Sequence, residues 1–96
     1  MARAAIPPDA VAYARSPTFT EATVPAALLK AHNTKPGVWG RICVERGELV
    51  YRVTDPRREP SEEVLSPDGP PGIVEPSILH EVEPRGPVSF YVEFCR

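Results

Sequence analysis

The chain is 96 residues long, carries a formal net charge of −2 and contains 13 prolines. A chain of this length folds as one domain with a small core. The slightly acidic balance argues against a nucleic-acid partner, because phosphate binding needs a basic face. No apolar run approaches the roughly 20 residues that cross a bilayer, and Pro7 and Pro8 interrupt any apolar segment near the N-terminus. We therefore expect a cytoplasmic protein without a membrane or nucleic-acid partner.

The prolines favour strands and turns, since proline breaks the interior of a helix. Residues 1–15 are predicted to form an N-terminal arm, and residues 16–96 the folded domain. The segment 22–32 (ATVPAALLKAH) comes nearest to a helical pattern, but Pro25 lies within it, so we expect an entry into a strand. Strands are predicted at residues 38–44, 48–53, 63–65, 72–75, 77–82 and 88–95, with Gly47 in a hairpin turn between the first two. Short strands at this spacing predict an all-β sandwich or barrel.

The last two predicted strands indicate which side chains share a face. In the strand 88–95, Phe90, Val92 and Phe94 fall on one face and Glu93 falls on the other. In the strand before it, His80 falls on the more apolar face, which should point inward. Alternation alone leaves open which face of the last strand is inside.

Three motifs carry a resemblance to a known family. They are HNTKPGVWG from His32, V-x-x-G-x-L-x-Y from Val44 and EPxxxHxVEP from Glu75. Together they resemble the cupin-like N-terminal domain of tellurite-resistance protein B and its stand-alone relatives. The resemblance extends over residues 13–95, which is nearly the whole chain.

The resemblance implies a single all-β, cupin-like double-stranded β-helix barrel over residues 16–96, associated as a homodimer. It also implies a link with resistance to tellurite or other oxyanions. A methyltransferase domain follows this region in the full-length relatives. The present sequence has no glycine-rich nucleotide loop, so methyl transfer is not carried over to it.

His32 and His80 are the candidate metal ligands, with Glu93 as the third ligand and Glu75 as an alternative carboxylate. Two imidazoles and a carboxylate can hold zinc, iron or nickel. Metal-dependent cupins use two closely spaced histidines and a glutamate before a later histidine, but residues 35–37 (KPG) stand where that first pair is expected. Rings more than about 8 Å apart would exclude a shared mononuclear site. The alternative is that His80 is a core histidine and that His32 lies at the end of a strand.

Arg41 and Lys35 are candidates for an anion pocket, because a guanidinium on a strand offers a rigid fork of donors to an oxyanion. Trp39 and Tyr51 could line the mouth of this pocket. The alternatives are that Arg41 is a solvated residue paired with a glutamate such as Glu93, and that Trp39 belongs to the core or to a dimer interface.

These observations leave three hypotheses for function. The first is a binding domain that holds a divalent metal, a small molecule or an oxyanion in the barrel. The second is a metal-dependent cupin enzyme of the isomerase or oxygenase type, which would use His32, His80 and a carboxylate. The third is a non-catalytic, dimeric interaction module. No Ser/His/Asp or Cys/His arrangement is visible in the sequence, so no catalytic residue is assigned.

Overall fold

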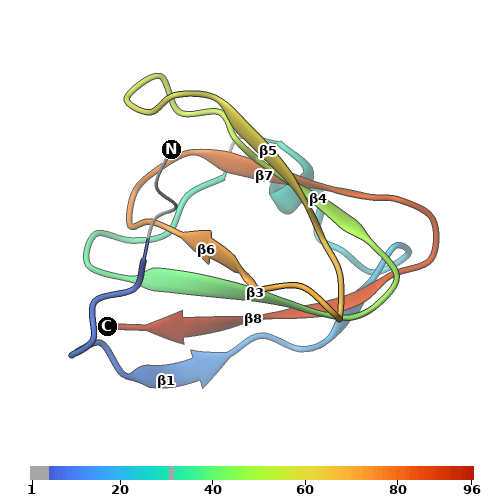
Figure 1. Cartoon of the computed structure of the whole chain (residues 1–96), viewed down its shortest axis with the longest axis horizontal. Helices are drawn as coiled ribbons and strands as arrows, with labels where there is room; N and C mark the ends of the chain where they lie inside the picture. Colours follow the sequence, from blue (N-terminus) through green and yellow to red (C-terminus); the bar gives the residue numbers. More distant parts are fainter. Residues whose placement is uncertain (1–4, 31) are drawn as a thin grey trace.

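The computed structural model describes residues 5–30 and 32–96, which form short strands and one short helix (Figure 1). The strands are β1 (Ala12–Arg15), β2 (Phe19–Thr20), β3 (Trp39–Arg46), β4 (Leu49–Val53), β5 (Ser61–Leu65), β6 (Gly72–Val74), β7 (His80–Pro84) and β8 (Ser89–Cys95). The helix, η1, is a 3₁₀ turn over Ala26–Leu29. Within residues 5–30 and 32–96, no helix combines the length and the hydropathy that a membrane span needs.

The strands form two antiparallel sheets that face each other across the core (Figure 1). One sheet has the order β1-β8-β3-β6, with β2 also paired to β8, and the other has the order β5-β4-β7. The prediction of an all-β chain is confirmed. Among the described residues no ladder joins the edges of the two sheets. The sheets therefore stay open, and the closed double-stranded β-helix that the resemblance implied is not confirmed.

The register between β3 and β8 decides which side chains face the core. Ile42 pairs with Val92, and Arg41 pairs with Glu93, so these two pairs lie on opposite faces of the sheet. Ile42 belongs to the buried core, whereas Arg41 and Glu93 are partly exposed. The apolar face of β8 is therefore the inner one. The core consists of Ile42, Leu49, Tyr51, Leu65, Val74, Val82, Val88 and Phe90.

The turn at Gly47 carries the chain from one sheet to the other. β3 has β6 and β8 on its two sides, whereas β4 has β5 and β7. Because both edges of each strand are occupied, the hairpin predicted between them is wrong. Gly47 has φ +75°, and a Cβ at this position would overlap the carbonyl oxygen of Pro87. Glycine is required here both for its backbone conformation and for its missing side chain.

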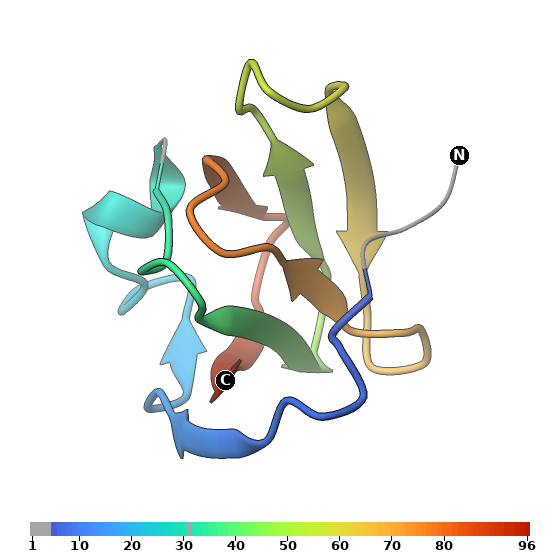
Figure 2. The ribbon, with the colours of Figure 1, turned by 90° about the vertical axis from the view of Figure 1, so that its left-hand side faces the viewer.

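The N-terminal third differs most from the expected elements. The predicted arm contains β1, which pairs with β8, and Val11 and Arg96 exchange backbone hydrogen bonds of 3.0 and 3.1 Å. Residues 1–4 of that arm lie outside the described residues, as does residue 31. The expected strand entry at 22–32 is wrong, because this segment contains η1. Pro25 occupies the N-cap position of η1 without a side-chain hydrogen bond, so it precedes the helix and does not interrupt it. Figure 2 shows η1 beside β7.

Candidate functional site

A cavity of about 240 Å³ lies between the two sheets. Its walls come from the inner faces of both sheets and from the segment 25–34, which contains η1. The lining is mostly apolar, and no Asp, Glu, Lys or Arg of the described residues contributes to it. The lining residues are Ser16, Phe19, Pro25, Ala27, Leu28, His32, Thr34, Ile42, Val74, His80, Val82, Phe90, Val92 and Phe94.

Two histidines stand together in the wall of this cavity. His32 joins the first residue of β7, His80, in an isolated antiparallel bridge. Each backbone N–H donates to the carbonyl of the other residue at 2.8 Å. The ring centroids are 5.4 Å apart, and the ring planes meet at 82°. Nδ1 of His32 is buried and has no hydrogen-bond partner among the described residues.

His80 is held in one orientation and one tautomer. Its Nδ1 lies 3.1 Å from the carbonyl oxygen of Ile78. A carbonyl only accepts, so Nδ1 carries the proton and Nε2 is the acceptor of the neutral ring. The ring of Tyr51 packs edge-on against His80 at 5.8 Å, and the Tyr51 hydroxyl donates to the carbonyl of Ile73 at 2.9 Å. Burial lowers the pKa of His80, the hydrogen bond to Ile78 opposes this, and His32 adds a smaller lowering.

The lowered pKa of His80 predicts a loss of stability in mild acid. Its ordinary pKa is 6.5, so the unfolded chain binds a proton at this histidine before the folded protein does. The free energy of unfolding must then fall as the pH drops below about 6.5 towards the folded pKa. We expect the Tm, followed by circular dichroism, to fall between about pH 7.5 and 5.5, and to fall less in His80→Phe. An equal slope in the two proteins would contradict this assignment.

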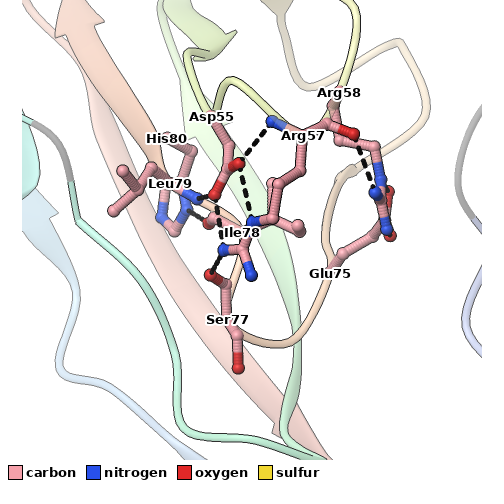
Figure 3. Close-up of polar contacts among 8 residues, drawn as sticks. All are labelled: Asp55, Arg57, Arg58, Glu75, Ser77, Ile78, Leu79 and His80. Atoms are coloured by element: carbon pink, nitrogen blue, oxygen red, sulfur yellow. Dashed lines mark hydrogen bonds and ion pairs between the residues drawn. The ribbon is translucent and has the colours of Figure 1, made fainter.

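A buried carboxylate holds the loop that precedes His80 (Figure 3). Asp55 is 2% exposed and follows β4. Its Oδ2 accepts from the backbone N–H of Leu79 at 3.0 Å and from Nη2 of Arg57 at 2.7 Å. Its Oδ1 accepts from the backbone N–H and from Nε of Arg57 at 2.8 and 2.9 Å. These bonds, and above all the side-chain bond to Arg57, hold the pKa of Asp55 well below its ordinary value.

Further bonds fix the same loop. Nη2 of Arg57 donates to the carbonyl of Ser77 at 2.7 Å, and the backbone N–H of Ser77 donates to the carbonyl of Thr34 at 3.2 Å. Ser77 has φ 66°, a left-handed conformation that costs a non-glycine residue energy. The surrounding bonds hold it there. The group formed by Asp55 and Arg57, here called the carboxylate clamp, thus positions His80 through the loop 77–79.

The structure does not bring the predicted carboxylate ligands to the two histidines. Glu93 lies on the outer face of β8, where it forms an ion pair with Arg41 of β3. Glu75 forms an ion pair of 2.8 Å with Arg58. In the described part of the chain, no group of three or more His, Cys, Asp or Glu is placed to hold a metal ion. Among the described residues, no Asp or Glu lines the cavity beside the histidine pair.

The four residues predicted for an anion pocket are also separated. Arg41 faces outward and is paired with Glu93. By alternation along β3, Trp39 lies on the same outer face and is half-buried. Lys35 is exposed in the turn before β3. Tyr51 is 4% exposed and belongs to the core, on β4 of the other sheet.

Sequence reasoning missed the carboxylate clamp. Residues 54–62 lie between two of the predicted strands, and no site was assigned to them. A local signal was present, because Asp followed by Pro favours a turn in which the carboxylate accepts the backbone N–H two residues later. Asp55 and Arg57 make this bond. The bond to Leu79 had no such signal, because 24 residues separate the two partners.

Comparison with known proteins places these features in a family. The model of the TehB-like domain matches residues 14–92. The probable S-adenosyl-L-methionine-dependent methyltransferase TehB of Haemophilus influenzae is 32% identical over 76 residues in strain KW20 and 30% identical over 76 residues in strain 10810. Each alignment covers 78% of this chain and 27% of the relative. The chain thus spans about a quarter of the length of these curated relatives.

Two crystal structures share the fold. TehB from H. influenzae superposes with a TM-score of 0.82 and 26% identity, over 92% of this chain and 32% of that chain. A protein from Escherichia coli K12 superposes with a TM-score of 0.83 and 24% identity, over 97% of this chain and 96% of that chain. The second likeness is one of fold, along nearly the whole of both chains. With the family model matching most of its length, the chain belongs to the TehB-like domain family, as its three sequence motifs indicated.

Proposed function

We propose that this chain is a small-molecule-binding domain and that the cavity between its sheets is the binding site. The observation that carries the proposal is the pair His32 and His80 in the wall of a mostly apolar cavity. Apolar pockets with a few convergent polar groups are the usual form of a ligand site. The carboxylate clamp supports the same proposal, because it fixes the backbone next to His80 from outside the cavity. Given the family, we propose that the domain serves in resistance to tellurite or related oxyanions, beside a methyltransferase activity.

The methyl donor of the relatives is a poor fit for this cavity. S-adenosyl-L-methionine carries a sulfonium cation, an ammonium group, a carboxylate and a ribose diol. The described lining has no carboxylate for the cations or the diol and no Lys or Arg for the carboxylate. Charged groups buried without partners are strongly disfavoured. We therefore propose that the methyl donor binds outside this cavity.

A divalent metal ion is the second candidate occupant. The observation that favours it is the 5.4 Å separation of the two imidazole rings, which leaves both within reach of one ion. The enzyme hypothesis, a cupin-type isomerase or oxygenase, depends on such an ion. Elemental mass spectrometry of protein purified without a histidine tag distinguishes the two occupants. Near-stoichiometric zinc, iron or nickel that is lost in folded His80→Phe would favour the metal, and a folded, metal-free protein would favour the small molecule.

Binding of a small neutral probe tests the proposed site. We expect toluene or benzyl alcohol, added to ¹⁵N-labelled protein, to shift the amide signals of residues on the inner faces of β7 and β8. Val92→Phe adds a ring to the cavity wall, so it should weaken binding by roughly tenfold or more. The matched control is the double variant Arg41→Gln/Glu93→Gln, which changes the outer face of the same strands and should leave binding unchanged.

Two outcomes of this titration would overturn the proposal. One is the absence of any saturable shift at the cavity residues. The other is binding that survives Val92→Phe but is lost in the outer-face double variant, which would move the site to Arg41. Circular dichroism on both variants shows whether they keep the fold.

Three expectations from the sequence stay predictions. They are a cytoplasmic location, a homodimer, and a boundary between an arm of residues 1–15 and a cupin-like domain of residues 16–96. Light scattering on the eluting protein tests the dimer. Removal of residues 1–15 tests the boundary, and because that segment contains β1, the shortened chain would lose the β1–β8 ladder.

A further inference from the structure

We infer that the cavity selects an uncharged molecule with a small apolar body and a hydroxyl group, and that this hydroxyl donates its hydrogen to Nε2 of His80. The inference rests on the proposed function, because it names the chemical class of the ligand for the same cavity. It also makes a free oxyanion the wrong ligand for this site.

The near absence of charge in the described lining favours an uncharged ligand. No acidic or basic side chain of the described residues lines the cavity apart from the two histidines. Transferring an ion from water to such a place is costly unless an opposite charge meets it. Arg41, which was predicted for an anion pocket, lies on the outer face and forms an ion pair with Glu93. An anion in the cavity would therefore be unpaired. A neutral ligand avoids the desolvation cost of an unpaired charge.

The fixed tautomer of His80 favours a ligand with a hydrogen-bond donor. Because Nδ1 donates to the carbonyl of Ile78, Nε2 is the acceptor nitrogen of the neutral ring, and His80 lines the cavity. Turning the ring over would break the bond between Nδ1 and the carbonyl of Ile78. A ligand that pairs with Nε2 of His80 must therefore carry a hydrogen-bond donor.

The size of the cavity favours a small ligand. Pockets for drug-sized ligands usually measure about 300–1,000 Å³, and this one measures about 240 Å³. It suits a single ring or a short branched chain. Phe19, Phe90 and Phe94 contribute aromatic surface to its walls, which packs well against a flat apolar body. A small aromatic or cyclic alcohol combines this body with the required donor.

Three matched probes test the inference. Benzyl alcohol, toluene and benzoate share a six-membered ring with one attached carbon, and they differ in hydroxyl and charge. One hydrogen bond predicts that benzyl alcohol binds about 3- to 10-fold more tightly than toluene. An unpaired charge predicts that benzoate binds at least roughly tenfold more weakly than benzyl alcohol. Dissociation constants from NMR titration at neutral pH give these ratios.

His80→Phe is the decisive variant, because it keeps an aromatic ring and removes the acceptor. The preference for benzyl alcohol over toluene should disappear, while toluene still binds. The double variant Arg41→Gln/Glu93→Gln should keep the full preference. If His80→Phe does not fold, the parent protein supplies the same information. The ¹⁵N resonance of Nε2 should then move on addition of benzyl alcohol and remain in place with toluene.

The outcomes separate this inference from the function on which it rests. If none of the three probes binds at the cavity, the proposed function fails. If probes bind but benzoate equals or exceeds benzyl alcohol, the cavity is an anion site and the inference alone is overturned. If toluene equals benzyl alcohol, or if Nε2 does not respond to the alcohol, the role of His80 as acceptor is wrong.

Discussion

Replacing Gly47 with alanine is expected to lower the free energy of unfolding by about 2–4 kcal/mol. Two costs combine at this position. The left-handed backbone, with φ +75°, disfavours any residue that has a Cβ. The new methyl group would also overlap the carbonyl oxygen of Pro87, which is backbone and cannot swing aside. Relief therefore requires movement of the segment that leads into β8. Equilibrium urea unfolding, followed by circular dichroism, measures the loss.

Gly86→Ala is the matched control for this prediction. Gly86 has φ +76°, nearly the same backbone conformation, but no atom lies within 4 Å of the position that a Cβ would take. The control bears the backbone cost alone, about 1–2 kcal/mol. If Gly47→Ala and Gly86→Ala lower the free energy of unfolding equally, the close approach to Pro87 adds nothing to the loss.

Asp55→Asn is expected to lower the Tm by roughly 10 °C or more at neutral pH. The carboxylate accepts four hydrogen bonds, from the backbone and side chain of Arg57 and from the backbone of Leu79. The asparagine amide has the same shape, but its NH₂ group cannot accept the hydrogen bonds that one carboxylate oxygen accepted. It also lacks the negative charge that faces Arg57. The buried donors that remain unpaired raise the cost further. Thermal denaturation followed by circular dichroism measures the change.

Asp68→Asn is the control for Asp55→Asn, because Asp68 is exposed in the turn that precedes β6. It should change the Tm by very little, as surface substitutions usually do. The pH adds a second check. The pKa of Asp55 is depressed from its ordinary 3.8, so its contribution to stability is present above that pH and is lost as the pH falls further. The gap in Tm between parent and Asp55→Asn should therefore narrow below about pH 4, and a constant gap would argue against the clamp.

The same clamp connects stability to the proposed site. Asp55 binds the backbone of Leu79, the residue directly before His80. Loosening this bond in Asp55→Asn should weaken the preference for benzyl alcohol more than it weakens binding of toluene, because only the alcohol uses His80. A purely structural role for Asp55 would reduce both equally.

The sequence predicts those parts of the fold whose signal is local. The alternation of Phe90, Val92 and Phe94 indicated a strand, and β8 confirms it. The strand β3 was expected from its apolar residues. By contrast β1 (Ala12–Arg15) and β2 (Phe19–Thr20) have no alternating pattern long enough to detect, and both exist because β8 offers them backbone partners. Their formation is a property of the assembled sheet, which no short window of sequence contains.

The candidate site was predictable to a similar degree. The resemblance placed His32 and His80 in two of its motifs, and the fold joins them through a backbone bridge. Glu93 lies on the outer face, away from them, and alternation along β8 could not say beforehand which face is buried. The cavity itself arises from packing between two sheets. Its apolar lining comes from several separate segments, and their convergence follows only from the topology.

The position of β8 in the chain has a consequence for synthesis. β8 is the last strand, yet it pairs with β1, β2 and β3, the first three. On the ribosome, the five-stranded sheet therefore cannot assemble until residues 89–95 have left the exit tunnel, whereas β4, β5 and β7 can pair earlier. Closing a ladder between residues about 80 positions apart is slow, with folding times on the order of milliseconds to seconds. The cavity needs both sheets, so it is among the last features to form as the polypeptide emerges.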